Sequence, residues 1–440
     1  MKKLTKTAVS LSENLMGFID DSPTPFHAVQ NMSTVLKLAG FEELKEKEQW
    51  EIKPGNRYFV TREDASIAAW ITGSHSPARH GFRIVGAHTD SPNLKIKPNP
   101  DIQKEDYQQL GVEVYGGVLL SSWADRDLSL AGRVITTDKN NKTLRKLFLK
   151  VDRAVLRIPL LCVHLNRDVN TLGLILNPQK HLAPVFGLKS KVEDPLRRFL
   201  SKELKTEPDQ IVDYDLSLYD VQKSNFLGLS EEFVAAPRLD NLFSCFCGLE
   251  ALLALNQKKQ PFQKTCMMVA FDNEEIGSLT TQGARSSFLK GIINRINHSF
   301  SDGPSQAYER SLASSVFLSA DMAHALHPNY PERHDPQHFP RINGGPVIKI
   351  NAQGRYATSG YTSAAFQLIC KRRRIPFQKF VNRTDLACGS TIGPFVASDL
   401  GIPSLDVGAA QLSMHSIREM CGSADAYYMI EAFKGFYEDA

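Results

Sequence analysis

Residues Phe82–Asp90, with the sequence FRIVGAHTD, decide the fold, because an apolar run there ends abruptly in an imidazole and a carboxylate. Residues Thr265–Glu275, TCMMVAFDNEE, repeat this form with three carboxylates in the last four positions. Each apolar run is short and continuous, which predicts a buried strand. In open α/β sheets, ligands bind at the carboxyl ends of the strands, so we expect an active site where these two runs end.

Further acids and histidines lie at the ends of other predicted elements. Asp321 follows a strand predicted over 315–320, and Asp240 begins a helix predicted over 239–255. Histidine and carboxylate ligands suit zinc, manganese or cobalt. A two-metal site with one bridging carboxylate needs about five ligands, with the metals ~3.5–4 Å apart. The candidate metal ligands are His88, Asp240, Glu275, Asp321 and His415.

Two more acids have roles beside this ligand set. Glu274 precedes Glu275 and is not one of the five candidate ligands. A glutamate beside a metal ligand that does not itself bind the metal is typical of a general base. Asp90 lies two residues after His88 and can orient its ring by accepting the second ring N–H. Together these residues predict a metal-dependent hydrolase.

Each candidate has a simpler explanation when it is taken alone. Aspartate at the position of Asp240 often caps a helix, the turn 272–275 can be solvated, and His415 can be a structural histidine. Several histidines follow Asp321, and we expect them to be loop residues rather than ligands: His324, His327, His334 and His338. One shared site is favoured because five such residues at element ends would otherwise be independent coincidences.

The composition is that of an ordinary globular protein with two domains. A chain of 440 residues is too long for a single core, and its 42% hydrophobic and 23% charged residues are usual values. The net charge of +4 gives no reason to expect binding to nucleic acid or to a membrane. Seven scattered cysteines without a C-x-x-C pair predict reduced thiols and a cytoplasmic location.

The predicted catalytic domain is split in sequence. Alternating strand and helix periods predict an α/β domain with a mixed sheet and helices on both faces. The middle of the chain differs, with short alternating segments such as 112–115 and 133–136. We therefore expect a strand-rich, β-sandwich-like insert at 99–234 and a catalytic domain formed by 1–98 and 235–440.

At this point the sequence resembles the aspartyl aminopeptidase family of metallopeptidases, peptidase family M18. The matching segments span nearly the whole chain, and their order and spacing argue against chance. They are Gly86–Pro92 (GAHTDSP), Asp125–Leu128 (DRDL) with Ala131–Arg133 (AGR), Pro237–Asn241 (PRLDN), Phe271–Ser278 (FDNEEIGS), Asp321–His324 (DMAH), His327–Tyr330 (HPNY) and Gln411–Ser416 (QLSMHS).

The resemblance implies a role for each candidate ligand. Asp240 would bridge two divalent metal ions per chain, with zinc expected and manganese or cobalt as alternatives. His88 and Asp321 would complete one metal site. Glu275 and His415 would complete the other.

The resemblance also implies the catalytic and substrate-binding residues. Glu274 would be the general base, and Asp90 would hold His88. Lys349 would meet an acidic substrate side chain.

The family's insert mediates dimer contacts, and its members often assemble as tetrahedral dodecamers. His164, which lies in the insert, would reach the active site of a neighbouring subunit and stabilise the developing oxyanion. Some members have a second histidine before this position, where this chain has Leu160 and Leu161. This departure leaves His164 without a helper and leaves the fine substrate preference open.

We therefore expect a metal-dependent aminopeptidase that removes Asp or Glu from peptides with a free N-terminus. One alternative is another dinuclear amide hydrolase, such as a dipeptidase, carboxypeptidase or deacylase, which would share the metal site but recognise a different part of the substrate. The other is a non-catalytic assembly protein that kept the fold. Such a protein should have lost a ligand or the base, and this chain retains all six positions.

Overall fold

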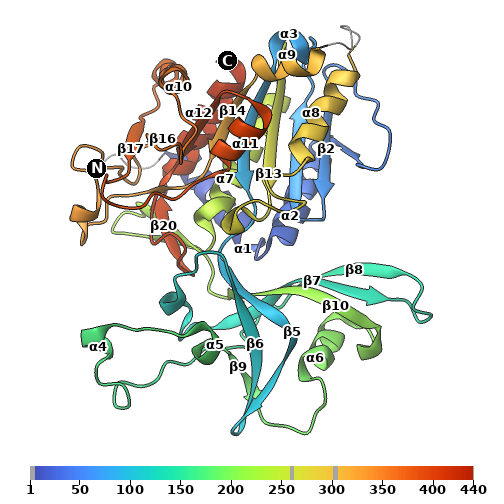
Figure 1. Ribbon diagram of the computed structural model, residues 1–440, viewed down its shortest axis with the longest axis vertical. Coiled ribbons are helices and arrows are strands. Elements are labelled where there is room, and N and C mark those ends of the chain that lie inside the picture. The colour runs from blue at the N-terminus through green and yellow to red at the C-terminus, as the bar shows by residue number, and fades with distance from the viewer. Residues whose placement is uncertain (1–4, 258–261, 301–305, 440) are drawn as a thin grey trace. The chain divides into compact units, whose positions relative to one another are not determined.

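The computed structural model describes residues 5–257, 262–300 and 306–439. The chain forms two compact units, each of which has most of its residue contacts within itself. Figure 1 colours the chain from the N- to the C-terminus. Unit 1 contains the residues up to Asp90, then Ser224–Met414 and the residues from Glu419 onward. Unit 2 contains Ser91–Lys223 and His415–Arg418.

These divisions come earlier in the chain than the predicted boundaries at 98/99 and 234/235. Strand β5 (Asn93–Lys104) runs without interruption across position 99 in the sheet of unit 2. Strand β12 (Phe233–Ala236) pairs with β11 (Asn225–Leu227) in unit 1. The predicted boundaries followed the change to short alternating segments, whereas the observed divisions follow the pairing of these strands.

Unit 1 is built on a mixed sheet with the strand order β1-β2-β3-β13-β4-β14-β18-β16-β17. At its centre β4 (Phe82–His88) and β13 (Thr265–Phe271) are parallel, and every residue of both is buried, which explains their continuous apolar sequences. β14 (Val316–Ala320) lies parallel to β4 on its other side. The remaining strands are β1 (Glu42–Leu44), β2 (Arg57–Arg62), β3 (Ser66–Ile71), β16 (Val347–Ile350), β17 (Gln378–Val381) and β18 (Ser404–Gly408).

Helices cover both faces of this sheet, as predicted. Successive side chains of a strand point to opposite faces, so Val85 and Ile84 belong to two different cores. The core around Val85 includes side chains of α1 (Lys6–Asp20), α2 (Pro25–Leu38), α7 (Leu239–Asn256), α10 (Gly360–Arg373) and α12 (Asp425–Asp439). The core around Ile84 includes side chains of α8 (Phe288–His298), α9 (Ala307–Ala313) and α11 (Ile392–Leu400).

Helix α7 is long and apolar enough to cross a membrane by length and composition alone, yet 78% of that window is buried inside the structure. This burial is typical of the core helix of a globular protein.

A smaller sheet in unit 1 has the order β11-β12-β20-β19-β15. Strand β20 (Glu419–Gly422) lies antiparallel to both β12 and β19 (Ala410–Leu412). β15 (Ala323–His324) follows β14 closely and pairs in parallel with β19. This sheet therefore joins the segments that immediately precede α7 and immediately follow β14.

Unit 2 is strand-rich, as predicted, and forms an antiparallel sheet in the order β8-β7-β10-β5-β6-β9. A core of its own includes Leu94, Leu130 and the helix residue Leu196. The remaining elements of unit 2 are β6 (Tyr107–Tyr115), β7 (Leu128–Thr137), β8 (Leu144–Lys150), β9 (Val185–Leu188), β10 (Ile211–Asp220), α4 (Val169–Leu172), α5 (Pro178–His181) and α6 (Pro195–Leu204).

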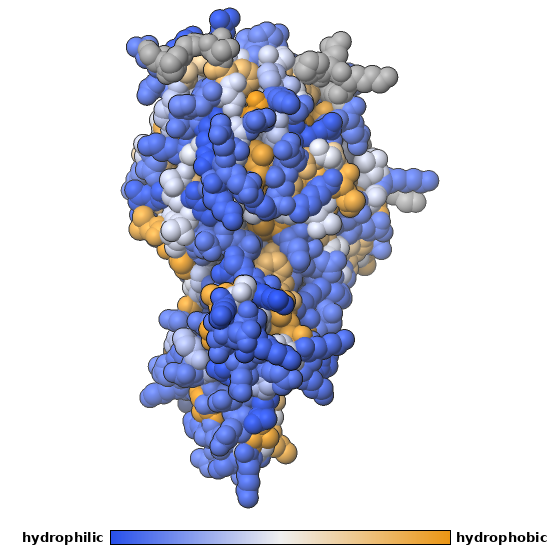
Figure 2. All heavy atoms as spheres, turned by 90° about the vertical axis from the view of Figure 1, so that its right-hand side faces the viewer, coloured by the Kyte–Doolittle hydropathy of each residue, from blue (hydrophilic) through white to orange (hydrophobic). Residues whose placement is uncertain are grey.

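The face of the molecule in Figure 2 is mostly hydrophilic with scattered apolar side chains, as the composition predicts.

Candidate metal centre

The candidate site of unit 1 lies where three parallel strands end. His88 is the last residue of β4 and is paired in register with Phe271, the last residue of β13. Asp321 directly follows β14. Because β13, β4 and β14 are parallel neighbours, their carboxyl ends share one edge of the sheet, and the residues after them are brought together.

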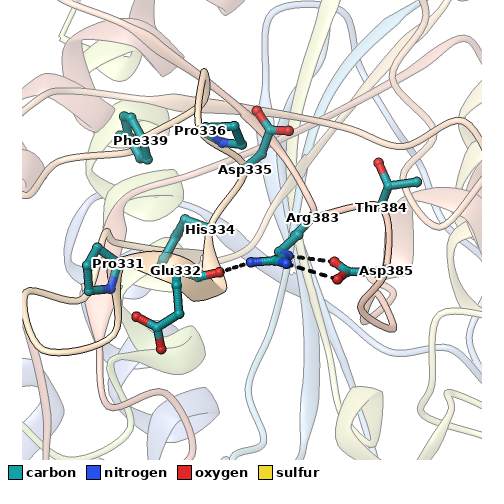
Figure 3. A pocket seen from close by; sticks show the side chains of 9 residues that line it. All are labelled: Pro331, Glu332, His334, Asp335, Pro336, Phe339, Arg383, Thr384 and Asp385. Carbon is teal, nitrogen blue, oxygen red and sulfur yellow. Dashed lines mark hydrogen bonds and ion pairs between the residues drawn. The ribbon is translucent and has the colours of Figure 1, made fainter.

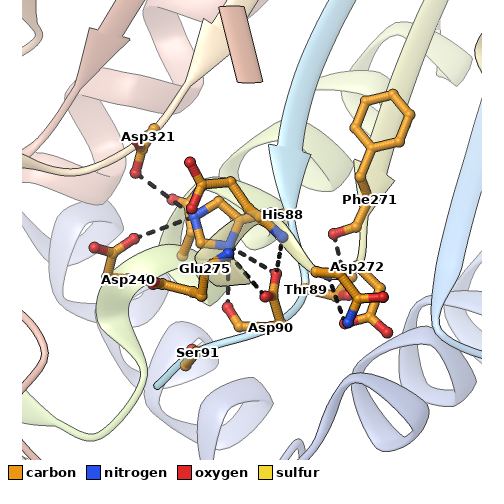
Figure 4. A network of polar contacts seen from close by, with 12 residues as sticks. His88, Thr89, Asp90, Ser91, Asp240, Phe271, Asp272, Glu275 and Asp321 are labelled. Carbon is orange, nitrogen blue, oxygen red and sulfur yellow. Dashed lines mark hydrogen bonds and ion pairs between the residues drawn. The ribbon is translucent and has the colours of Figure 1, made fainter. Parts of the chain in front are cut away.

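His88 is the centre of a buried polar network (Figure 4). Its Nδ1 lies 3.0 Å from the Asp90 carbonyl oxygen and 3.2 Å from Asp90 Oδ1. A carbonyl oxygen can only accept, so Nδ1 carries a proton. Nε2 faces Asp240 Oδ1 at 3.4 Å and Asp321 Oδ1 at 3.7 Å, which is the arrangement of an imidazole that binds a metal through Nε2.

Asp90 connects His88 to the turn that carries Glu274 and Glu275. The backbone N–H of Glu274 donates to Asp90 Oδ1 at 3.1 Å, and that of Glu275 donates to Oδ2 at 3.1 Å. The turn begins at Asn273, which has a positive φ of 64°. Asp272 and Asn273 are both buried, so the alternative of a solvated turn does not apply to its start.

Asp240 lies in the first turn of α7, where the backbone is not yet helical. Asn241 also has non-helical backbone angles, so the regular helix begins only after these two residues. The Asn241 amide donates to the Ala320 carbonyl at 2.8 Å, which ties the start of α7 to the end of β14. Asp240 and Asp321 are therefore set beside each other by their neighbours in the chain.

Sequence reasoning missed two residues that support this network. The Cys245 thiol on α7 donates to the His88 carbonyl oxygen over 3.0 Å. The Glu419 carboxyl on β20 accepts the Asp240 backbone N–H at 2.9 Å. Glu419 lies four residues after His415, and its acidic side chain on a short apolar strand was the only signal for it in the sequence.

The charges of the network shift the pKa of its members. Burial alone would lower the pKa of His88, but Asp240, Asp321 and Asp90 together raise it well above its usual value. Burial raises the pKa of Glu274 well above that of an ordinary glutamate, and the neighbouring Asp321 and Glu275 raise it further. So many buried carboxylates repel one another, and a cation among them would relieve the repulsion.

The donor atoms fit a zinc site. In the described part of the chain, ligand atoms of His88, Asp240 and Asp321 lie within 4.8 Å of one another, as do those of His88, Glu274 and Glu275. One imidazole nitrogen with carboxylate oxygens is a usual zinc ligand set. Four of the candidate residues in unit 1 and the expected base are thus brought together by the fold.

His415 is in unit 2, and its surroundings are described within that unit. Its Nδ1 lies 2.9 Å from the Gly117 carbonyl oxygen, which again leaves Nε2 as the nitrogen for a metal. Its place among the ligands remains a prediction.

Lys349 on β16 lies next to a candidate ligand. Its Nζ is 3.3 Å from Asp321 Oδ2 and 5.5 Å from the centre of the Tyr356 ring, and only 3% of the residue is exposed. The ammonium group expected to meet an acidic substrate is therefore already paired with Asp321. A substrate carboxylate would be its second partner.

His164 is an exposed residue of unit 2 and lies in a loop. The apolar side chains of Leu161 and Leu165, on either side of it, are 60% and 73% exposed.

The four histidines after Asp321 do not join the candidate ligands. Within the described ranges, none of them belongs to a group of ligand atoms lying within 4.8 Å of one another. His334 instead lines a separate cavity of about 620 Å³, where Arg383 binds the Asp385 carboxylate and the Glu332 carbonyl oxygen (Figure 3). The expectation that these histidines lie in loops is wrong for His324, which is the last residue of β15. The expectation that Asp321 rather than these histidines binds the metal stays a prediction.

Comparisons with known proteins agree with one another. The family described as aminopeptidase I zinc metalloprotease (M18) matches residues 18–437. A probable M18 family aminopeptidase 2 from Ectopseudomonas mendocina (strain ymp) is 43% identical over 432 residues, which cover 97% of this chain and 98% of the relative.

Two solved structures extend this likeness to the fold. The cryo-EM structure of the Ape4 and Nbr1 complex is 39% identical with a TM-score of 0.95, covering 100% of this chain and 88% of that one. The S. cerevesiae mApe1 dodecamer is 29% identical with a TM-score of 0.86, covering 98% of this chain and 97% of that one.

Proposed function

Because the chain belongs to the M18 family of zinc-dependent aminopeptidases, we propose that it removes acidic residues from the free N-termini of peptides, with Glu274 as the general base. Family membership makes the chain a metal-dependent enzyme that hydrolyses N-terminal peptide bonds. The acidic preference, the number of metal ions and the role of each residue are our proposal. The observation that carries it is the cluster of His88, Asp240, Asp321, Glu274 and Glu275 at one edge of the sheet, of which the first three are buried and the two glutamates half-buried.

We propose that two zinc ions are held at this edge. His88 and Asp321 would hold one, Glu275 and His415 the other, and Asp240 would bridge them. Bound zinc polarises a carbonyl group and lowers the pKa of a water from ~15.7 towards ~7.

Glu274 has the environment that a general base needs. Burial raises the pKa of its carboxyl group, and a carboxylate with a raised pKa is a stronger proton acceptor. Hydrogen bonds from the turn to Asp90 hold its backbone in place. Glu274 would take the proton of the attacking water and deliver it to the nitrogen of the leaving amine.

A free N-terminal amine fits the charge of the cluster. Several carboxylates at the candidate centre attract a cation, and the protonated α-amine of a peptide is one. A dipeptidase, carboxypeptidase or deacylase would instead recognise a free carboxylate or an acyl group. An N-acetylated peptide separates these possibilities, because an aminopeptidase should leave it intact.

Lys349 supports the preference for acidic residues. Its ammonium group is buried, and a charge that is poorly solvated interacts more strongly with a counter-charge than an exposed one does. The substrate carboxylate would approach the ammonium beside Asp321.

We further propose that the chain self-associates as dimers that assemble into a tetrahedral dodecamer. The exposed apolar side chains around His164 support an interface in unit 2. His164 would then serve the active site of a neighbouring subunit. All seven cysteines are free and five are buried, which supports the expected cytoplasmic location.

One experiment tests the proposed activity directly. The zinc-reconstituted protein is offered a panel of peptides that differ only in the N-terminal residue, together with their N-acetylated forms. We expect turnover of the free peptides, fastest for Asp and Glu, and none of the acetylated ones. Equal turnover of both forms would contradict aminopeptidase activity, and faster turnover of Leu would contradict the acidic preference.

A further inference from the structure

A buried carboxyl group outside the predicted ligand set contacts one of the ligands. Glu419, the first residue of β20, is 2% exposed, and its Oε2 accepts the backbone N–H of Asp240 at 2.9 Å. Asp240 is the residue expected to bridge the two metals. We propose that Glu419 is a positioning residue that sets the zinc affinity of the centre by fixing the backbone of Asp240, an inference that rests on the proposed metal site.

The local backbone explains why Asp240 needs such support. Asp240 and Asn241 have non-helical backbone angles, so the regular helix does not hold them. The first N–H groups of a helix have no partner within the helix and must be satisfied from outside. A side-chain oxygen that accepts one of these N–H groups therefore holds the backbone at this end.

Side chains of three residues make hydrogen bonds that hold this segment. The Arg238 guanidinium donates to the carbonyl oxygens of Ser22 and Ile19, both at 3.1 Å. The Asn241 amide donates to Ala320 at the end of β14. Among the contacts described, that of Glu419 falls on the backbone of the ligand residue itself. An aspartate side chain is short, so the position of its carboxylate follows the position of its backbone closely.

The small sheet of unit 1 places Glu419 for this contact. Ala236 on β12 is paired with Glu419 on β20, and the chain continues from Ala236 through Leu239 into α7. A shift of this register by one residue would turn Glu419 to the opposite face of the sheet. The strand pairing therefore fixes the distance between the Glu419 carboxyl and the start of α7.

Three substitutions of Glu419 separate position from charge. Glu419→Gln keeps an acceptor at the same reach and loses the charge. Glu419→Asp keeps the charge and shortens the reach, and Glu419→Met removes the acceptor. Residues that orient a metal ligand typically contribute about 10–100-fold in metal affinity. We expect the zinc dissociation constant to rise by roughly that factor in the Asp and Met variants and to stay within about threefold in the Gln variant.

Asp425 supplies a matched control in the same unit. It is fully buried and its carboxyl group accepts the backbone N–H of Asn343 at 2.8 Å and of Gly345 at 3.2 Å, neither of which is a candidate ligand. Asp425→Asn and Asp425→Leu should lower the melting temperature as the Glu419 variants do. They should leave the zinc dissociation constant unchanged.

The test is a competition titration of each folded apoprotein with a zinc-binding dye, with thermal melting measured in parallel. Wild-type protein that binds no zinc would refute the proposed metal site. Wild-type binding with unchanged affinity in the Asp variant would overturn the positioning role, and so would a Gln variant as weak as the Asp variant, because charge would then be what matters. If the Met variant fails to fold, the Asp and Gln variants still decide the question.

Discussion

Unit 1 holds His88, Asp240 and Asp321 buried and close together, whereas unit 2 carries His164 on an exposed loop. His88 is 1% exposed and has Asp90, Asp240 and Asp321 around its ring. His164 instead lies between the exposed side chains of Leu161 and Leu165. The geometry around His88 is set by the core of unit 1. His164 has no such surroundings in its exposed loop, and in our proposal a neighbouring subunit packs against this loop and fixes its position.

Removal of the metal should have the largest effect, because it disables the whole centre of unit 1. Dialysis against a chelator should abolish turnover, and added zinc should restore it. Unit 2 offers no candidate ligand besides His415, so its own fold should change little. Circular dichroism before and after chelation checks this. A fully active metal-free preparation would contradict a metal-dependent centre in unit 1.

Loss of the base should be the next largest effect. Glu274→Gln removes the proton acceptor but keeps the size of the side chain, so turnover should fall by about 10²–10⁴-fold. Zinc content should stay at the wild-type level, because the expected ligands are unchanged. Turnover near that of the wild type would remove Glu274 from the mechanism, and a loss of zinc would show that it is a ligand.

His164→Ala should lower turnover by roughly 10²–10³-fold, the usual effect of losing one oxyanion-stabilising donor, without loss of zinc. His181, another exposed histidine of unit 2, provides the control, and His181→Ala should stay active.

Subunit mixing then asks which chain His164 serves. Inactive Glu274→Gln chains are combined with inactive His164→Ala chains after reversible dissociation. If His164 serves a neighbour, some mixed dimers contain one intact composite site, and activity partly returns. A mixture that stays inactive although the chains have exchanged would contradict the shared site.

Lys349→Met should have the smallest effect, and one confined to acidic substrates. A hydrogen bond to a charged group stabilises the bound state by about 1.5–3 kcal/mol. Without it, kcat/KM for an aspartyl substrate should fall on the order of 10–100-fold. The value for a leucyl substrate should change much less. Because Lys349 also contacts Asp321, zinc content is measured in the same preparation. Equal losses for both substrates would assign Lys349 a structural role.

The strand ends of unit 1 could be predicted from sequence because the signal there is local. A run such as Thr265–Phe271 is apolar throughout only when both faces of its strand are buried, and the observed strand has those same bounds. The acids and the histidine at the ends of such runs are easily recognised in the sequence, because the residues before them are apolar. Helices and strands at 239–255 and 315–320 were likewise placed within one residue of α7 and β14.

What the sequence did not reveal depends on pairing between distant segments. The boundaries of unit 2 are set by β5 and β12, whose partners decide the unit to which they belong. Glu419 acts through a hydrogen bond to a residue 179 positions away in the chain, which no periodicity indicates. The pairing of Lys349 with Asp321 is of the same kind, because it depends on how β16 and β14 are placed in one sheet.

The zinc content of the purified chain, measured against turnover as zinc is added back, tests the central claim most directly. We predict that activity reaches its maximum at about two zinc ions per chain. Asp240→Asn, which alters the expected bridge, should bind fewer ions and lose activity in proportion. Full activity without zinc, or wild-type zinc content and turnover in Asp240→Asn, would contradict a two-zinc centre at the edge of the unit 1 sheet.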